Sequence, residues 1–116
     1  MSTPAVVDFT LVRGDSKTIY LGVGRSGTRL NLTGATVRGQ ARTDEDDNQV
    51  ELTFTCVLAN QGVDPGGVYC TIDKAESAAV SAYALKYDIE IEFANGENLT
   101  PIAGVITMKK DVTRVV

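Results

Sequence analysis

The sequence alternates apolar and polar residues most cleanly in Tyr87-Asp88-Ile89-Glu90-Ile91-Glu92-Phe93. Successive side chains of a β-strand point to opposite faces, so this alternation predicts a strand with an apolar face toward the core and an acidic face toward solvent. Asn95-Gly96 follows, and both residues tolerate the positive φ of a tight turn. The pattern therefore predicts a β-hairpin whose return strand carries Ile106 and Met108 inward and runs to about Asp111.

The same period of two recurs in five earlier stretches, which turn residues separate. They are residues 7–11, 18–23, 35–42, 50–56 and 68–72. About seven strands in 116 residues match the immunoglobulin-like class in number and spacing. We predict an all-β fold, an immunoglobulin-like β-sandwich, and a single domain over residues 1–116 because this length suits one hydrophobic core.

One short helix is expected between the fifth and sixth strands. Asp73 can cap its first turn, Glu76 follows at capping-box spacing, and the alanines at 75, 78 and 79 favour helix. Its length should be about two turns.

Composition excludes several kinds of partner. Lys and Arg number 11 against 15 Asp and Glu, and the net charge of −4 gives no general attraction to nucleic acid. No apolar run approaches the roughly 20 residues that span a membrane, and the start lacks the basic head and apolar stretch of a secretory signal. We expect synthesis in a cytosol and no nucleic-acid or membrane partner.

The sequence offers no catalytic constellation. A nucleophile needs an adjacent base, and the chain has no histidine. Asp88, Glu90 and Glu92 share the outward face of one strand, where carboxylates ordinarily solubilise a sheet. We predict a protein that is not an enzyme, with no catalytic residues and no small-molecule substrate.

No metal or cofactor site is expected either. Cys56 and Cys70 are too few for a zinc site. Asp44, Asp46 and Asn48 have the alternate spacing of a calcium loop, but no glycine follows them and the position of the closing glutamate is a threonine. A solvated acidic loop is the better interpretation.

Arg13-Gly14-Asp15 matches the tripeptide that integrins recognise. Gly and Asp are favoured in turns for their own backbone reasons, so turn chemistry explains this motif better than adhesion does.

Two pairings follow from the expected sandwich. Its third and sixth strands are adjacent, so Arg38 and Arg42 should face the acidic residues of the sixth strand. If the strands carrying Cys56 and Cys70 pair, the two cysteines come within disulfide reach. We expect free thiols, because a cytosol keeps them reduced.

Three stretches occur together in a specific order. Residues 9–21 hold two strands around the Gly14-Asp15 turn, residues 30–42 begin Leu30-Asn31-Leu32-Thr33-Gly34, and residues 87–114 hold the closing hairpin. Together they resemble the small immunoglobulin-like virion modules of tailed bacteriophages, a group of baseplate-upper-protein-like and head-decoration-like domains.

The resemblance implies a structural protein of a tailed-bacteriophage virion. It points first to a capsid cement or decoration subunit, with a neck, tail or baseplate component as the alternative. It also implies that the partners are other virion proteins, from capsid or tail, and copies of the chain itself, and that synthesis takes place in the host bacterial cytoplasm. The sequence has no long extension after its last strand, so we expect a free-standing subunit.

The two ends of the sequence lack a regular pattern. We therefore expect contacts with neighbouring subunits to order them, together with contacts along the edge strands. The expected partner-binding residues are Pro4, Ala5, Val6, Val112, Val115 and Val116.

A carbohydrate- or cell-surface-binding module is the alternative from another class. Sugar binding favours exposed aromatic side chains, and the strand faces use Phe9, Phe54, Tyr87 and Phe93. Tyr20, Tyr69 and Tyr83 remain as candidates.

Overall fold

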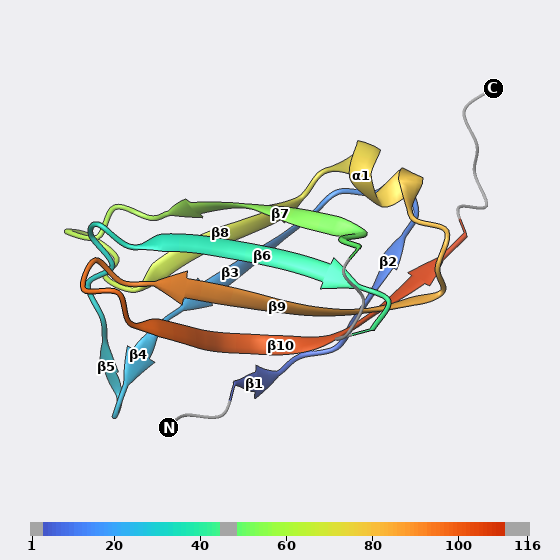
Figure 1. Cartoon of the computed structure of the whole chain (residues 1–116). Coiled ribbons are helices and arrows are strands. Elements are labelled where there is room, and N and C mark those ends of the chain that lie inside the picture. Colours follow the sequence, from blue (N-terminus) through green and yellow to red (C-terminus); the bar gives the residue numbers. More distant parts are fainter. Residues whose placement is uncertain (1–3, 45–48, 111–116) are drawn as a thin grey trace.

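The computed structural model describes residues 4–44 and 49–110, in which ten strands and one helix follow one another (Figure 1). The elements are β1 (Ala5–Val6), β2 (Phe9–Val12), β3 (Lys17–Gly22), β4 (Gly24–Arg25), β5 (Thr28–Arg29), β6 (Thr36–Arg42), β7 (Leu52–Leu58), β8 (Gly67–Ile72), α1 (Lys74–Ala79), β9 (Ala84–Glu92) and β10 (Asn98–Lys109). The chain is all-β in class, as the alternating pattern predicts. No helix among these residues is long and apolar enough to cross a membrane.

Eight of the strands form one curled, mixed sheet. Its order is β1-β10-β9-β6-β7-β8-β3, and β2 also pairs with β10. Strands β1 and β2 run parallel to β10, whereas the other pairs are antiparallel. The first half of β7 pairs with β6 and its second half with β8, so this strand carries the sheet from one layer into the other.

The curl brings β3 and β8 behind β6 and β9 (Figure 1), and both layers bury side chains in one core. The core contains isoleucines of β9 and β10 together with buried residues of β7 and β8. The fully buried aliphatic side chains are Leu32, Leu52, Val68, Ile72, Leu85, Ile89, Ile91 and Ile106. Burial of each contributes roughly 1.5–3 kcal/mol, so the alternating apolar faces supply the main stabilisation of the fold.

The helix begins after Asp73, whose carboxylate accepts a hydrogen bond from the backbone N–H of Ala75. This is the cap that the sequence predicts. Helix α1 lies between β8 and β9, and its buried Ser77 hydroxyl accepts from the N–H of Gly14 and donates to the carbonyl of Asp15. The helix is thereby fastened to the turn between β2 and β3.

Two segments differ from the prediction. Residues 24–28 lie between two of the expected strands and were not assigned to either. They contribute the hairpin β4–β5, because Ser26 and Gly27 both adopt the positive φ of a tight two-residue turn. The N-terminal stretch was expected to need neighbouring subunits to order it. In the structure Ala5 and Val6 pair with Ile102 and Ala103 of β10, so these two residues have backbone partners in the chain's own sheet.

Candidate functional site

The outer face of β3, β8 and β7 carries a block of uncharged side chains. The strand register aligns Thr18 with Thr71, and Tyr20 with Tyr69, across β3 and β8. It then aligns Thr71 with Thr55, and Tyr69 with Val57, across β8 and β7. We call these six residues the tyrosine face: Thr18, Tyr20, Thr55, Val57, Tyr69 and Thr71.

The tyrosine face is open to solvent. Tyr20, Tyr69 and Val57 are 44 %, 45 % and 58 % exposed. The two tyrosine rings lie 5.2 Å apart at 55°, and the hydroxyls of Thr18 and Thr71 are 3.0 Å apart. Exposed tyrosines offer a large apolar area and a polar group with few rotatable bonds, which is why they are enriched in protein interfaces.

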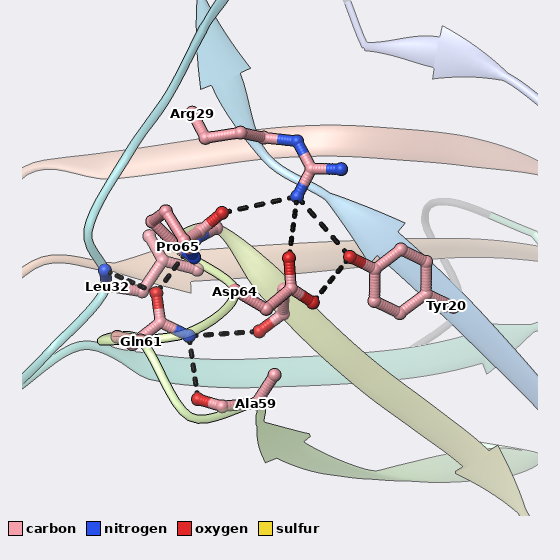
Figure 2. Close-up of polar contacts among 9 residues, drawn as sticks. Tyr20, Arg29, Leu32, Ala59, Gln61, Asp64 and Pro65 are labelled. Carbon is pink, nitrogen blue, oxygen red and sulfur yellow. Dashed lines mark hydrogen bonds and ion pairs between the residues drawn. The ribbon is translucent and has the colours of Figure 1, made fainter.

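Arg29 and Asp64 border this face at one end. The guanidinium of Arg29 lies 3.2 Å from the Asp64 carboxylate, which in turn accepts a hydrogen bond of 2.7 Å from the Tyr20 hydroxyl (Figure 2). The pKa of Arg29 is raised first by its hydrogen bond to Tyr20 and also by Asp64. A Cβ at Gly22 or Gly67 would strike these two side chains, so the paired glycines leave room for them. Because the positive charge of Arg29 and the negative charge of Asp64 cancel, this border of the tyrosine face has no net charge.

Gln61 holds the loop that carries Asp64. Its side chain is almost fully buried, and its oxygen accepts from the N–H groups of Leu32 and Gly66 (Figure 2). Its nitrogen donates to the carbonyls of Ala59 and Gly67. All hydrogen-bonding positions of this amide are used, which stabilises the loop in one arrangement.

Strand β3 forms an open edge beside the tyrosine face. Among the described residues only β8 pairs with it. The backbone N–H of Val23 donates to the carbonyl of Gly66. Hydrogen-bonded positions alternate along an antiparallel pair, so the backbone groups of Ile19 and Leu21 also point toward β8. Those of the residues between them point away from β8, namely Thr18, Tyr20 and Gly22. The edge lacks proline, and its lysine, Lys17, stands at its first position with its ammonium over the Phe9 ring. Such an edge can accept an added strand.

The opposite outer face, on β6 and β9, is charged. Arg38 lies directly across from Glu90, at 2.5 Å between side chains, and also contacts Glu92 at 3.7 Å. Hydrogen bonding to Glu90 is the main reason that the pKa of Arg38 is raised. The predicted adjacency of the third and sixth strands is confirmed. Arg42 lies directly across from Lys86 instead of an acidic residue, since the register places Asp88 opposite Gln40.

The expected partner-binding residues are divided by the structure. Pro4, Ala5 and Val6 lie at the β1 edge, where Val6 is 73 % exposed. Val112, Val115 and Val116 fall outside the described residues. None of the three at β1 lies on β3, β7 or β8, so the tyrosine face is a separate surface.

The Arg13-Gly14-Asp15 turn is used internally. One guanidinium nitrogen of Arg13 donates to the carbonyls of Ser81 and Ala82, and the guanidinium stacks 5.9 Å above the Tyr83 ring. The backbone of Gly14 and Asp15 is bound by Ser77. These contacts explain the motif as part of the fold.

Sequence reasoning identified Tyr20 and Tyr69 as exposed aromatics but missed their pairing, and it missed Arg29, Asp64 and Gln61. Tyr20 and Tyr69 lie on different strands, and only the β3–β8 register places them side by side. A buried glutamine in a loop has no sequence signature. The signal that did exist was the absence of charge at every outward position of residues 18–22 and 67–71.

No group of three or more metal-binding side chains lies together in the described part of the chain. Asp46 and Asn48 of the acidic loop fall outside that part. No protein-family model matches the sequence, and no curated protein matches it.

Proposed function

We propose that the chain is a non-enzymatic, immunoglobulin-like structural domain that docks an extended segment of another protein subunit on the β3 edge and the tyrosine face. The observation that carries this proposal is the coincidence of the two features. An open strand edge offers backbone hydrogen bonds, and the uncharged side chains beside it are buried without the cost of desolvating charges. The charged face of β6 and β9 lacks both advantages.

The strand order supports an immunoglobulin-like interpretation. In that fold the second and fifth strands are adjacent, as are the third and sixth. Here β3 pairs with β8, and β6 pairs with β9. Two features depart from the simple plan: β7 joins the two layers, and the N-terminal strands β1 and β2 pair with β10.

The sequence resemblance extends the proposal to the virion of a tailed bacteriophage. A capsid cement or decoration subunit is the first choice, and a neck, tail or baseplate component is the alternative. Repeated subunits of such particles bind through surfaces between proteins, which an open edge and a neutral face provide.

Truncating the N-terminus does not test docking by itself. Removing residues 1–6 also removes β1 from the sheet, so lost binding would not distinguish contact from folding. Substitutions on the tyrosine face avoid this problem because their side chains already point to solvent.

The test compares Val57→Lys with Thr36→Lys, which places the same charge on an exposed position of the opposite face. Virions purified from the host of origin are the probe, and co-sedimentation is the readout. Val57→Lys should weaken binding by about tenfold or more while melting normally, because docking would bury the new charge. Equal binding by both variants would overturn the proposal.

A second variant separates strand addition from simple side-chain contact. At Thr18 the backbone N–H points away from β8, so Thr18→Pro keeps the β3–β8 hydrogen bonds but removes a donor from the edge. We expect normal folding and lost docking. Unchanged docking would show that the β3 edge does not bind the partner.

The carbohydrate-binding alternative has one observation in its favour, the exposed pair Tyr20 and Tyr69. Their rings are tilted by 55°, which does not form the flat platform on which a sugar ring stacks well. Tyr83 does not join them, because it lies by Arg13. Glycan binding that Tyr69→Ala abolishes, by a protein that ignores virions, would favour this alternative.

A further inference from the structure

Cys56 and Cys70 lie directly opposite each other on the paired strands β7 and β8. Ala59 donates a backbone hydrogen bond to Gly67, so Ala59 and Gly67 form a hydrogen-bonded pair. Such pairs alternate along an antiparallel ladder, which puts the cysteines at a non-hydrogen-bonded position. Cα atoms there are typically about 4.5 Å apart, within the range of about 4.4–6.8 Å that a disulfide spans.

The two thiols differ in exposure and chemistry. Cys70 is fully buried, and Cys56 is partly exposed. A hydrogen bond from Cys70 lowers the pKa of the Cys56 thiol, whereas the same bond, followed by burial, raises the pKa of Cys70. Since the thiolate is the nucleophile, Cys56 is the thiol that a small oxidant reaches and that reacts first.

We propose that Cys56 and Cys70 form a redox-active pair, which a small-molecule disulfide such as glutathione disulfide oxidises to a cross-strand disulfide. Cys56 attacks one sulfur of the oxidant, forming a mixed disulfide and releasing one glutathione thiolate. Cys70 then attacks the Cys56 sulfur and releases the second. The two protein thiols lose two electrons and two protons, and the glutathione disulfide becomes two glutathione thiols.

The cross-link would lie directly beneath the tyrosine face, because the next residues along the strands, Val57 and Tyr69, are paired on its surface. It would covalently join the two strands that carry them. This proposal does not depend on the docking function, since it rests on the register of β7 and β8 and on the different exposure of the two thiols.

The experiment equilibrates the full-length, folded protein with glutathione buffers of increasing oxidising strength. Samples are quenched in acid, unfolded, alkylated and weighed by mass spectrometry. With increasing oxidation the doubly alkylated form should convert to an unlabelled form. Half of the folded protein should be converted in a buffer about tenfold less oxidising than the buffer that converts half of the protein in urea. Two alkylatable thiols at every ratio, an intermolecular dimer, or equal behaviour in urea would each overturn the proposal.

Single variants test the order of attack. Cys70→Ala should accumulate one glutathione on Cys56, whereas Cys56→Ala should resist glutathione because its remaining thiol is buried. Thermal melts check that both variants fold, and the wild-type titration decides the proposal if either does not. Glutathionylation of Cys56→Ala to the same extent as Cys70→Ala would contradict the assignment of Cys56 as the first nucleophile.

Discussion

The hydroxyl of Tyr87, on β9, donates a hydrogen bond of 2.6 Å to the backbone carbonyl of Val7, in the connection between β1 and β2. The side chain of Asp8 beside it accepts a bond of 2.9 Å from the N–H of Val105 on β10. These two contacts hold the N-terminal strands where the backbone ladder is interrupted. The side chains of Tyr87 and Asp8 therefore fasten the connection between β1 and β2 to β9 and β10.

Replacing Tyr87 by phenylalanine removes this bond and keeps the ring. We expect the free energy of unfolding to fall by about 1 kcal/mol, the usual net value of one hydrogen bond. Urea denaturation measures it. Tyr83→Phe is the matched control, because Tyr83 is 74 % exposed and its change should have no measurable effect.

The ionisation of Tyr87 should destabilise the fold in alkali. Burial, with a smaller contribution from Asp8, raises the pKa of Tyr87 to about 12 from 10.0. Above pH 10 the unfolded chain loses this proton first, so stability is lost as pH rises from about 10 to about 12. Melting temperatures over this interval should fall less steeply for Tyr87→Phe than for the wild type. Parallel curves would contradict the assignment.

Gln61→Glu should be the most damaging change in the loop of Asp64. A carboxylate cannot donate to the carbonyls of Ala59 and Gly67, and it buries a charge. We expect a loss of roughly 3 kcal/mol or more in urea denaturation. Asn60→Asp is the control: the Asn60 oxygen accepts from Gly62, which a carboxylate also does, so stability should change by under about 0.5 kcal/mol.

The contribution of Asp88 to the stability of the fold should be more favourable at acid pH than at neutral pH. Desolvation, with repulsion by Glu90, raises the pKa of Asp88 above 3.8, although Arg42 opposes this. When the pKa of a carboxyl group is higher in the folded than in the unfolded state, the protein loses stability as the pH rises from the unfolded to the folded pKa. Asp88→Asn should therefore raise the melting temperature at pH 7 and have no effect below about pH 3.

The control for Asp88 is Glu90→Gln, which removes a carboxylate that is paired with Arg38. It should not raise the melting temperature at pH 7. Stabilisation by both substitutions would mean that repulsion between Asp88 and Glu90, and not the burial of Asp88, is the main cause.

Gly104→Ala should displace β1 from the sheet edge. A Cβ at this position would lie 2.1 Å from the Val7 carbonyl oxygen, a backbone atom that cannot turn aside. We expect a loss of roughly 1–3 kcal/mol and faster amide exchange at Val7, whose N–H bonds to Ala103. Gly62→Ala is the control, because a Cβ there would meet the Asn60 side-chain oxygen at 3.3 Å and no backbone atom within 4 Å.

Local patterns were sufficient to predict most of the strands, the helix cap and the turn at Gly14. Alternation in residues 87–93, the capping aspartate Asp73 and a glycine at positive φ act through neighbouring residues, so the sequence shows them directly. The hairpin β4–β5 was missed although Ser26-Gly27 is a local signal, because the flanking strands are only two residues long.

The sequence by itself determined that the chain is all-β, which side of each main strand is apolar, and that Tyr20 and Tyr69 are available to solvent. Only the tertiary structure decided that these tyrosines meet, that Cys56 faces Cys70, and that β8 is the one strand of residues 4–44 and 49–110 that pairs with β3. The physical reason is register. A shift of one residue between paired strands turns a side chain to the other face, and that choice is made by packing the whole core, not by residues near one another in the chain.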